Sequence, residues 1–201
     1  MLSERVEPLQ TVMQSDIPED REEAGQIARA QSGDAAAIDW LLARYRNRVV
    51  RLATHILRRP GEAEDVAQEA FVRAFRNLRS FRGEGRFYSW LYQIVVRICL
   101  DRRQSSRWNA ETPLEPVSET LESTDTALGD VETRLLVEAL LDQLTPQNRA
   151  MLVLRELEGL EYEEIARVLG IPVGRVRWRL HAARAQFQEF WRNAQQEADH
   201  V

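Results

Sequence analysis

The chain has 201 residues, of which 44% are hydrophobic and 29% charged, and its net charge is −5. This composition fits one or two small globular cores, and no run approaches the roughly 20 apolar residues that a membrane span needs. A single cysteine, Cys99, excludes an internal disulfide and a cysteine-based zinc site, and a buried apolar role is expected for it.

The charge is divided unevenly along the chain. Residues 21–108 hold 17 arginines against 10 acidic residues, a balance of +7, whereas residues 109–133 hold seven acidic residues and no base. The total of −5 therefore conceals a basic domain followed by an acidic segment. The N-terminal MLSERVEPLQ has neither the basic nor the apolar segment of a secretory signal, so we expect a cytoplasmic protein.

The N-terminal part is predicted to be a mobile arm followed by two helices. Residues 1–20 contain two prolines and an excess of acids. A short helix is expected at about residues 21–32; Gly33 suits the position after its end, and Asp34 can cap the helix predicted at about residues 35–58. Pro60 and Gly61 are expected to end that second helix.

The stretch from residue 62 to residue 103 predicts two more helices joined by a basic loop. In the first helix an apolar stripe recurs at three- and four-residue steps: Val66, Ala67, Ala70, Phe71, Ala74, Phe75 and Leu78. Polar residues fall off this stripe and are expected to face outward: Asp65, Gln68, Glu69 and Arg73. A solvated helix face and a protein-binding face both fit them.

The loop at residues 79–86 mixes arginines, glycines and a phenylalanine, and aromatic residues crowd the start of the next helix. Guanidinium groups neutralise phosphates and rings stack on unpaired bases, so the mixture suits single-stranded nucleic acid. Aromatic residues at helical spacing also suit a core, and for Trp90 the two roles remain open. Because no segment alternates at period two, residues 21–104 are predicted to form an all-α bundle of four helices.

An acidic, flexible linker is predicted at residues 105–130, since the segment is rich in Ser, Thr, Glu and Pro. A second helical domain is predicted at residues 131–192, with residues 193–201 as a tail. In it Thr145-Pro146 reads as a helix start, and residues 162–187 read as two helices around a turn with Gly170 and Pro172, a helix-turn-helix.

The segments DVAQEAFVRAF, SFRGEGRFYSWLYQI and LDRR resemble region 2 of the sigma-70 family of bacterial transcription initiation factors, in its extracytoplasmic-function (group IV) form. The segment LRELEGLEYEEIARVLGIPVGRVRWRL resembles region 4 of the same family. Together the resemblance covers about residues 26–187. It implies two small helical domains, a four-helix region 2 and a helix-turn-helix region 4, joined by the acidic linker.

The resemblance implies three binding surfaces. The surface for core RNA polymerase, on the coiled coil of its largest subunit, would comprise Asp65, Gln68, Glu69 and Arg73. The surface for the unpaired strand of the −10 promoter element would comprise Phe81, Arg82, Gly83, Arg86, Phe87, Tyr88, Trp90, Gln93 and Arg97. The surface for the −35 duplex, read in the major groove, would comprise Arg175, Arg177, Trp178, Arg179, His181 and Arg184.

Four positions depart from the family pattern. Relatives usually carry arginine where this chain has Gln93 and asparagine where it has Arg97, and arginine donates hydrogen bonds but cannot accept them. Small polar or basic residues are common at the positions of Trp178 and Ala182, and the indole suits a thymine methyl or a sugar better than guanine. An unusual promoter preference is therefore expected.

The functional hypothesis is a dissociable specificity subunit of bacterial RNA polymerase that reads the −35 and −10 elements and promotes −10 strand opening. The alternative is a stand-alone helix-turn-helix regulator that binds duplex operators. We find no P-loop, no metal-spaced His/Cys set and no nucleophile–base pair, so no catalytic activity, metal or cofactor is expected. The resemblance also implies an anti-sigma partner, in many cases membrane-anchored; no direct membrane contact is expected.

Overall fold

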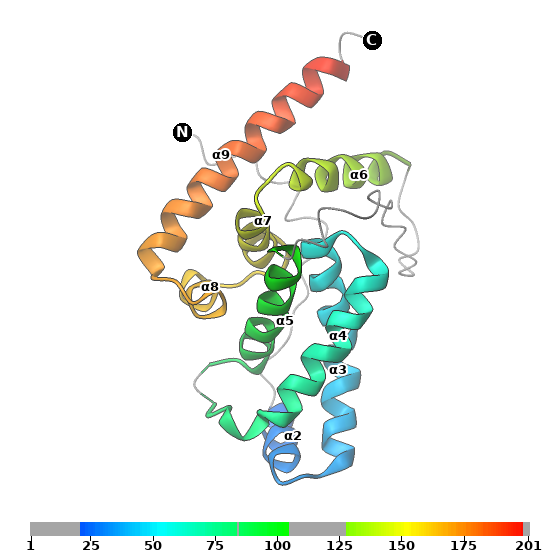
Figure 1. Ribbon diagram of the computed structural model, residues 1–201, viewed down its shortest axis with the longest axis vertical. Coiled ribbons are helices and arrows are strands. Elements are labelled where there is room, and N and C mark those ends of the chain that lie inside the picture. The colour runs from blue at the N-terminus through cyan, green and yellow to red at the C-terminus, as the bar shows by residue number, and fades with distance from the viewer. Residues whose placement is uncertain (1–20, 84, 105–127, 199–201) are drawn as a thin grey trace.

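The structure, a computed structural model, describes residues 21–83, 85–104 and 128–198, and across these ranges it holds helices and no strand (Figure 1). The prediction of an all-α fold is confirmed. The predicted arm at residues 1–20, most of the predicted linker (residues 105–127) and residues 199–201 lie outside the described residues.

The first domain is built from α2 (Arg21–Gln31), α3 (Ala35–Leu57), α4 (Pro60–Arg76), the 3₁₀ turn Leu78–Ser80 and α5 (Phe87–Gln104). Asp34 caps α3 as predicted, because its Oδ1 accepts hydrogen bonds from the backbone nitrogens of Ala36 at 2.9 Å and Ala37 at 3.3 Å. The helix ends before Pro60 and Gly61, as predicted, but Pro60 also has a second role. Arg58 ends α3 in a left-handed conformation with φ 62°, and Pro60 opens α4, where its missing N–H costs no helical hydrogen bond.

The core of this domain lies between α3, α4 and α5. Leu41, Tyr45 and Leu52 of α3 have no exposed surface, and the same holds for Leu91 and Tyr92 of α5. The predicted apolar stripe faces this core: it is buried throughout except for Phe75, which is partly buried, and its last member, Leu78, lies in the 3₁₀ turn after α4. Full burial of such side chains contributes about 1.5–3 kcal/mol each, so α4 is fixed with its polar face outward.

The second domain is built from α6 (Leu128–Asp142), α7 (Pro146–Leu152), the π-helical segment Val153–Leu157, α8 (Tyr162–Leu169) and α9 (Val173–Ala198). Thr145 caps α7, accepting a hydrogen bond from the nitrogen of Asn148 at 3.3 Å. Gly170 makes the sharp turn between α8 and α9 with φ 64°, a conformation that suits glycine. α6 begins inside the predicted linker.

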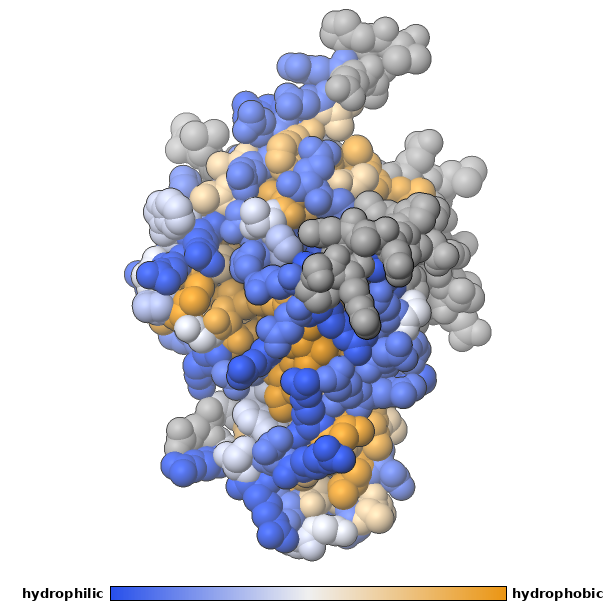
Figure 2. Space-filling view, viewed as in Figure 1, coloured by the Kyte–Doolittle hydropathy of each residue, from blue (hydrophilic) through white to orange (hydrophobic). Residues whose placement is uncertain are grey.

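Helix α9 is longer than predicted and runs past residue 192 to Ala198. Phe187 and Trp191 stack on it with ring centroids 6.4 Å apart, and Phe190 is partly buried. The helix crosses the top of the molecule and its end protrudes beyond α6, where hydrophilic side chains cover it (Figures 1 and 2).

The two domains pack against each other. Helix α5 lies between the rest of the first domain and the pair α7 and α8, and α3 also contacts α7 (Figure 1). One side of α5 therefore packs into the core of the first domain, and another side packs against the second domain.

Candidate nucleic-acid interface

The outer face of α4 presents exposed polar side chains, as expected from the sequence. Asp65 and Gln68 are exposed. Glu69 is half-buried because its Oε1 accepts from Arg73 Nη2 at 2.5 Å and its Oε2 from Arg102 Nη2 at 3.0 Å. Asp65 and Gln68 are thus the more accessible groups of this face.

Val72 adds an exposed apolar side chain to the same face. It lies one helical turn after Gln68, and half of its surface is exposed. Its position off the apolar stripe is visible in the sequence, so periodicity could have identified it. A face that combines an acid, an amide and an apolar side chain suits a protein partner better than a polyanion.

The basic segment after α4, which we call the arginine loop (residues 79–83 and 85–86), exposes Arg79, Arg82 and Arg86 to solvent. Two glycines shape it: Gly83 has φ 73°, Gly85 has φ 110°, and Gly85 N donates to Gly83 O at 2.9 Å. Side chains other than glycine adopt such φ values only with strain. The loop therefore projects its guanidinium groups from a tight backbone turn.

Aromatic rings pack at the base of the arginine loop. Fewer of them are exposed than a stacking surface made of all the predicted rings would require. Phe87 and Tyr88 are buried, whereas Phe81 and Trp90 are partly buried. Phe81 meets Phe87 edge-on at 5.3 Å and Trp90 at 5.5 Å between ring centroids. Phe81 and Trp90 are the rings left accessible for a base, while Phe87 and Tyr88 support them from below.

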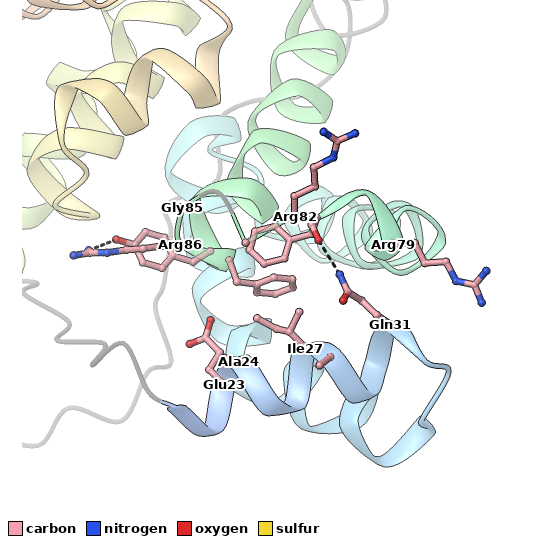
Figure 3. Close-up of a pocket in the computed structure, with 13 residues that line it drawn as sticks. Glu23, Ala24, Ile27, Gln31, Arg79, Arg82, Gly85 and Arg86 are labelled. Atoms are coloured by element: carbon pink, nitrogen blue, oxygen red, sulfur yellow. Dashed lines mark hydrogen bonds between the residues drawn. The ribbon is translucent and has the colours of Figure 1, made fainter.

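Two pockets flank the arginine loop. The larger, of about 850 Å³, lies between the loop and α2 (Figure 3). The smaller, of about 260 Å³, is lined by Phe81, Arg82, Trp90 and Gln93 of the first domain and by Arg167 of the second. Cationic, ring-lined hollows of this kind suit an unpaired base with its phosphate.

The second domain covers part of this face. Gln93 Nε2 donates to the backbone oxygen of Arg167 at 2.9 Å, so this predicted DNA contact is engaged within the chain. A Cβ placed on Gly85 would lie 2.7 Å from Arg167 Nη1, which shows how closely α8 approaches the loop. Arg97, one turn further along α5, stays exposed.

A buried polar contact, the Arg48 network (Arg48, Tyr92 and Glu158), joins the domains beneath this face. Arg48 donates to the Tyr92 hydroxyl at 3.1 Å and to Glu158 Oε2 at 3.2 Å, and the Tyr92 hydroxyl donates to the same oxygen at 2.5 Å. Burial, and next the negative charge of Glu158, raise the pKa of Tyr92 well above its ordinary value, so the phenol remains a neutral donor.

Two further contacts extend the interface in opposite directions. Ser89 Oγ donates to Glu164 Oε1 at 2.9 Å, and Glu164 Oε2 also accepts from the nitrogen of Glu161 at the start of α8. At the other end Arg58 pairs with Glu138 and, through Nε at 2.7 Å, with Asp142. The interface is therefore rich in charged groups, and Arg48 and Arg58 each pair with a carboxylate of the second domain.

The start of α9 carries the predicted duplex-reading residues. Arg175, Arg177, Trp178 and His181 are exposed, and Trp178 is the most prominent at 70%. Arg179 is half-buried. Arg184 is also half-buried and is engaged within the domain, since it donates twice to Glu156 Oε1, at 2.9 and 2.6 Å. The accessible cluster thus lies in the first two and a half turns of the helix.

In the described residues no group of three or more His, Cys, Asp or Glu side chains is placed to hold a metal ion. The helices described here also include none that is long and apolar enough to cross a membrane.

Comparisons with known proteins agree with the two-domain organisation. The family model described as Sigma-70 region 2 matches residues 41–109, and that described as Sigma-70, region 4 matches residues 134–187. The chain is 37% identical to the RNA polymerase sigma-H factor of Pseudomonas aeruginosa over 79% of its own length and 88% of that protein. It is 34% identical to the ECF RNA polymerase sigma-E factor of Escherichia coli K12, with the same coverage of both chains.

Solved structures share the fold. CnrH, in complex with the cytosolic domain of CnrY, has a TM-score of 0.65 and 24% identity over 87% of this chain and 99% of its own. The sigma factor RpoE in complex with the anti-sigma factor NepR, from Bartonella quintana, has a TM-score of 0.62 and 18% identity over 77% and 96%.

A Glu158→Gln variant should loosen the contact between the domains. It keeps the size of the side chain but leaves buried Arg48 without a charged partner, at an expected cost of about 2–3 kcal/mol. Small-angle X-ray scattering should show a larger radius of gyration for the variant than for the parent chain. Glu163→Gln, at an exposed position of α8, is the matched control. Equal radii for all three proteins would contradict a closing role of the network.

Proposed function

The chain belongs to the sigma-70 family, in its extracytoplasmic-function form, and is a transcription initiation factor. From this we propose which of its surfaces binds core polymerase and which surfaces bind the −10 and −35 promoter elements. The observation that carries the proposal is the match of both family regions, in order, to the two domains that display the three surfaces. Their boundaries are proposed at residues 21–104 and 128–198, where the second domain includes α6 and α9 in full.

Core RNA polymerase is proposed to bind the outer face of α4. Asp65 and Gln68 supply accessible polar groups, and Glu69 and Arg73 pair with each other beside them. The accessible Asp65 carboxylate disfavours phosphate, which supports a protein partner on this face. The proposed partner element is the coiled coil of the largest polymerase subunit.

The arginine loop and the exposed face of α5 are proposed to capture the unpaired −10 strand. Arg82 and Arg86 neutralise phosphates, Phe81 and Trp90 offer ring faces, and Gln93 and Arg97 contact base edges or backbone. Phe87 and Tyr88 act by supporting the loop. Strand opening then draws on binding energy, and no catalytic group of this chain is needed.

The start of α9 is proposed to enter the major groove of the −35 element, led by Arg175, Arg177, Trp178 and His181. Arg179 and Arg184 are half-buried against the rest of the second domain. They are proposed to stabilise α9 or to contact the DNA backbone that flanks the −35 element. Trp178, with most of its surface exposed, favours contact with a thymine methyl or a sugar.

The described arrangement is a closed one, and we propose that polymerase binding opens it. Ser89 and Gln93 contact α8 on the same face of α5 that would meet the −10 strand. Region 4 and the strand cannot occupy that face together. The acidic linker would then lie inside the enzyme, as the family resemblance implies.

An anti-sigma factor is the proposed inhibitory partner, and the cytoplasm, where polymerase works, the proposed location. The two solved structures compared above are complexes, one with the cytosolic domain of CnrY and one with the anti-sigma factor NepR. A stand-alone operator-binding regulator is not favoured, because the curated relatives are sigma factors.

Promoter-specific transcription with added core polymerase tests the proposal, and a variant of the α4 face sharpens it. Asp65→Ala combined with Gln68→Ala should weaken binding to core at least about tenfold, because two accessible polar contacts are lost. Fluorescence anisotropy with labelled chain measures the affinity, and circular dichroism should show unchanged helix content.

The matched control is Asp101→Ala with Gln104→Ala, an exposed acid and amide at the same spacing on α5. It should bind core as the parent does. Specific operator binding by the parent chain without core, or equal core affinity of both double variants, would contradict the assignment.

Arg175→Ala should flatten the salt dependence of −35 duplex binding. If Arg175 neutralises one phosphate, the slope of log affinity against log salt falls by about one unit. Titrations of holoenzyme on a −35 duplex at several salt concentrations give that slope. Arg192→Ala, an exposed arginine five turns further along α9, should leave it unchanged; equal slopes for the two variants would remove Arg175 from the interface.

A further inference from the structure

Gln31, the last residue of α2, ties that helix to the arginine loop. Its Nε2 donates to the backbone oxygen of Leu78 at 3.1 Å and to that of Phe81 at 2.8 Å. These two carbonyls bracket the 3₁₀ turn Leu78–Ser80, so both hydrogens of one amide are used across the base of the loop. Figure 3 shows the contact reaching from α2 to the loop.

The position of Phe81 depends on this tie. Phe81 is the arginine-loop residue that directly follows the 3₁₀ turn, and its ring packs against Phe87 and Trp90. Its backbone is held from one side by the hydrogen bond of Phe81 N to Leu78 O, at 3.1 Å, and from the other side by Gln31. Without the amide, the turn would keep its ring contacts but lose both of these hydrogen bonds to α2.

The shape of the larger pocket also depends on the Gln31 amide. Glu23, Ile27 and Gln31 of α2 form one wall, and Arg82 and Arg86 belong to the opposite wall (Figure 3). The width of this 850 Å³ hollow is therefore set by the distance between α2 and the loop, which the Gln31 amide spans. The family match to region 2 begins at residue 41, so α2 lies outside the matched segment.

We infer that Gln31 is a positioning residue for capture of the −10 strand, a role that rests on the proposed function. It touches no DNA in this assignment. Gln31 fixes the Phe81 carbonyl and the start of the arginine loop in place. In that position the exposed guanidinium groups of the loop and the rings of Phe81 and Trp90 can contact the same unpaired strand. Preorganisation of this kind lowers the entropy that a flexible loop would lose on binding.

Two variants separate the amide donors from the shape of the side chain. Gln31→Met keeps the length but removes both donors, and Gln31→Glu keeps the shape but turns acceptors towards two carbonyl oxygens. Gln26→Met and Gln26→Glu are matched controls at a half-buried glutamine of the same helix.

The experiment uses holoenzyme and a promoter selected from random duplexes with the parent holoenzyme. Affinity for core, affinity of the closed promoter complex, rate of open-complex formation, and binding of the same promoter with a pre-melted −10 element are measured for each variant. We expect both Gln31 variants to open the promoter about tenfold more slowly and to bind the pre-melted element more weakly, with core and closed-complex affinities unchanged.

Opening at the parent rate by the Gln31 variants would overturn the inference while leaving the proposed function intact. So would a parallel loss of core affinity and melting temperature, which would make Gln31 a general fold residue. Failure of the parent holoenzyme to open any promoter would instead count against the proposed function itself.

Discussion

The arrangement of the two domains depends on the Arg48 network. Arg48 of α3, Tyr92 of α5 and Glu158 of the second domain are all buried, and removing either Arg48 or Glu158 would leave a desolvated charge without its charged partner. The same charges would be well hydrated if the domains separated. Charged pairs between the domains, together with an apolar cluster that includes residues of both, hold this arrangement.

Helix α5 connects closure with promoter recognition. Leu91 and Val95 face the core of the first domain, whereas Ser89 and Gln93 face the second domain. The proposed −10 contacts share this second face, so the free chain satisfies with its own α8 the polar groups that an unpaired strand would satisfy in the initiation complex. Gln93, which departs from the family pattern, donates to a backbone oxygen here.

Much of the local structure could be predicted. The apolar stripe of α4, the caps at Asp34 and Thr145 and the turn at Gly170 follow from short-range rules, and the structure confirms each of them. The helix predicted to end before Pro60 does end there, at Leu57, but Pro60 also opens α4, because proline suits the first turn of a helix as well as the segment beyond one. Periodicity also placed Phe87 and Tyr88 at the loop, but not their burial.

The sequence by itself determined the helices, their apolar faces, the division of charge and, through resemblance, the three candidate surfaces. Only the tertiary structure decided which side chains those surfaces leave available. Arg184 is engaged by Glu156, Gln93 by the backbone of Arg167, and the arginine loop by Gln31. The physical reason is that each partner lies 28 to 74 residues away, so the contact depends on how helices cross. Helical periodicity identifies a buried face but not the atoms that meet it.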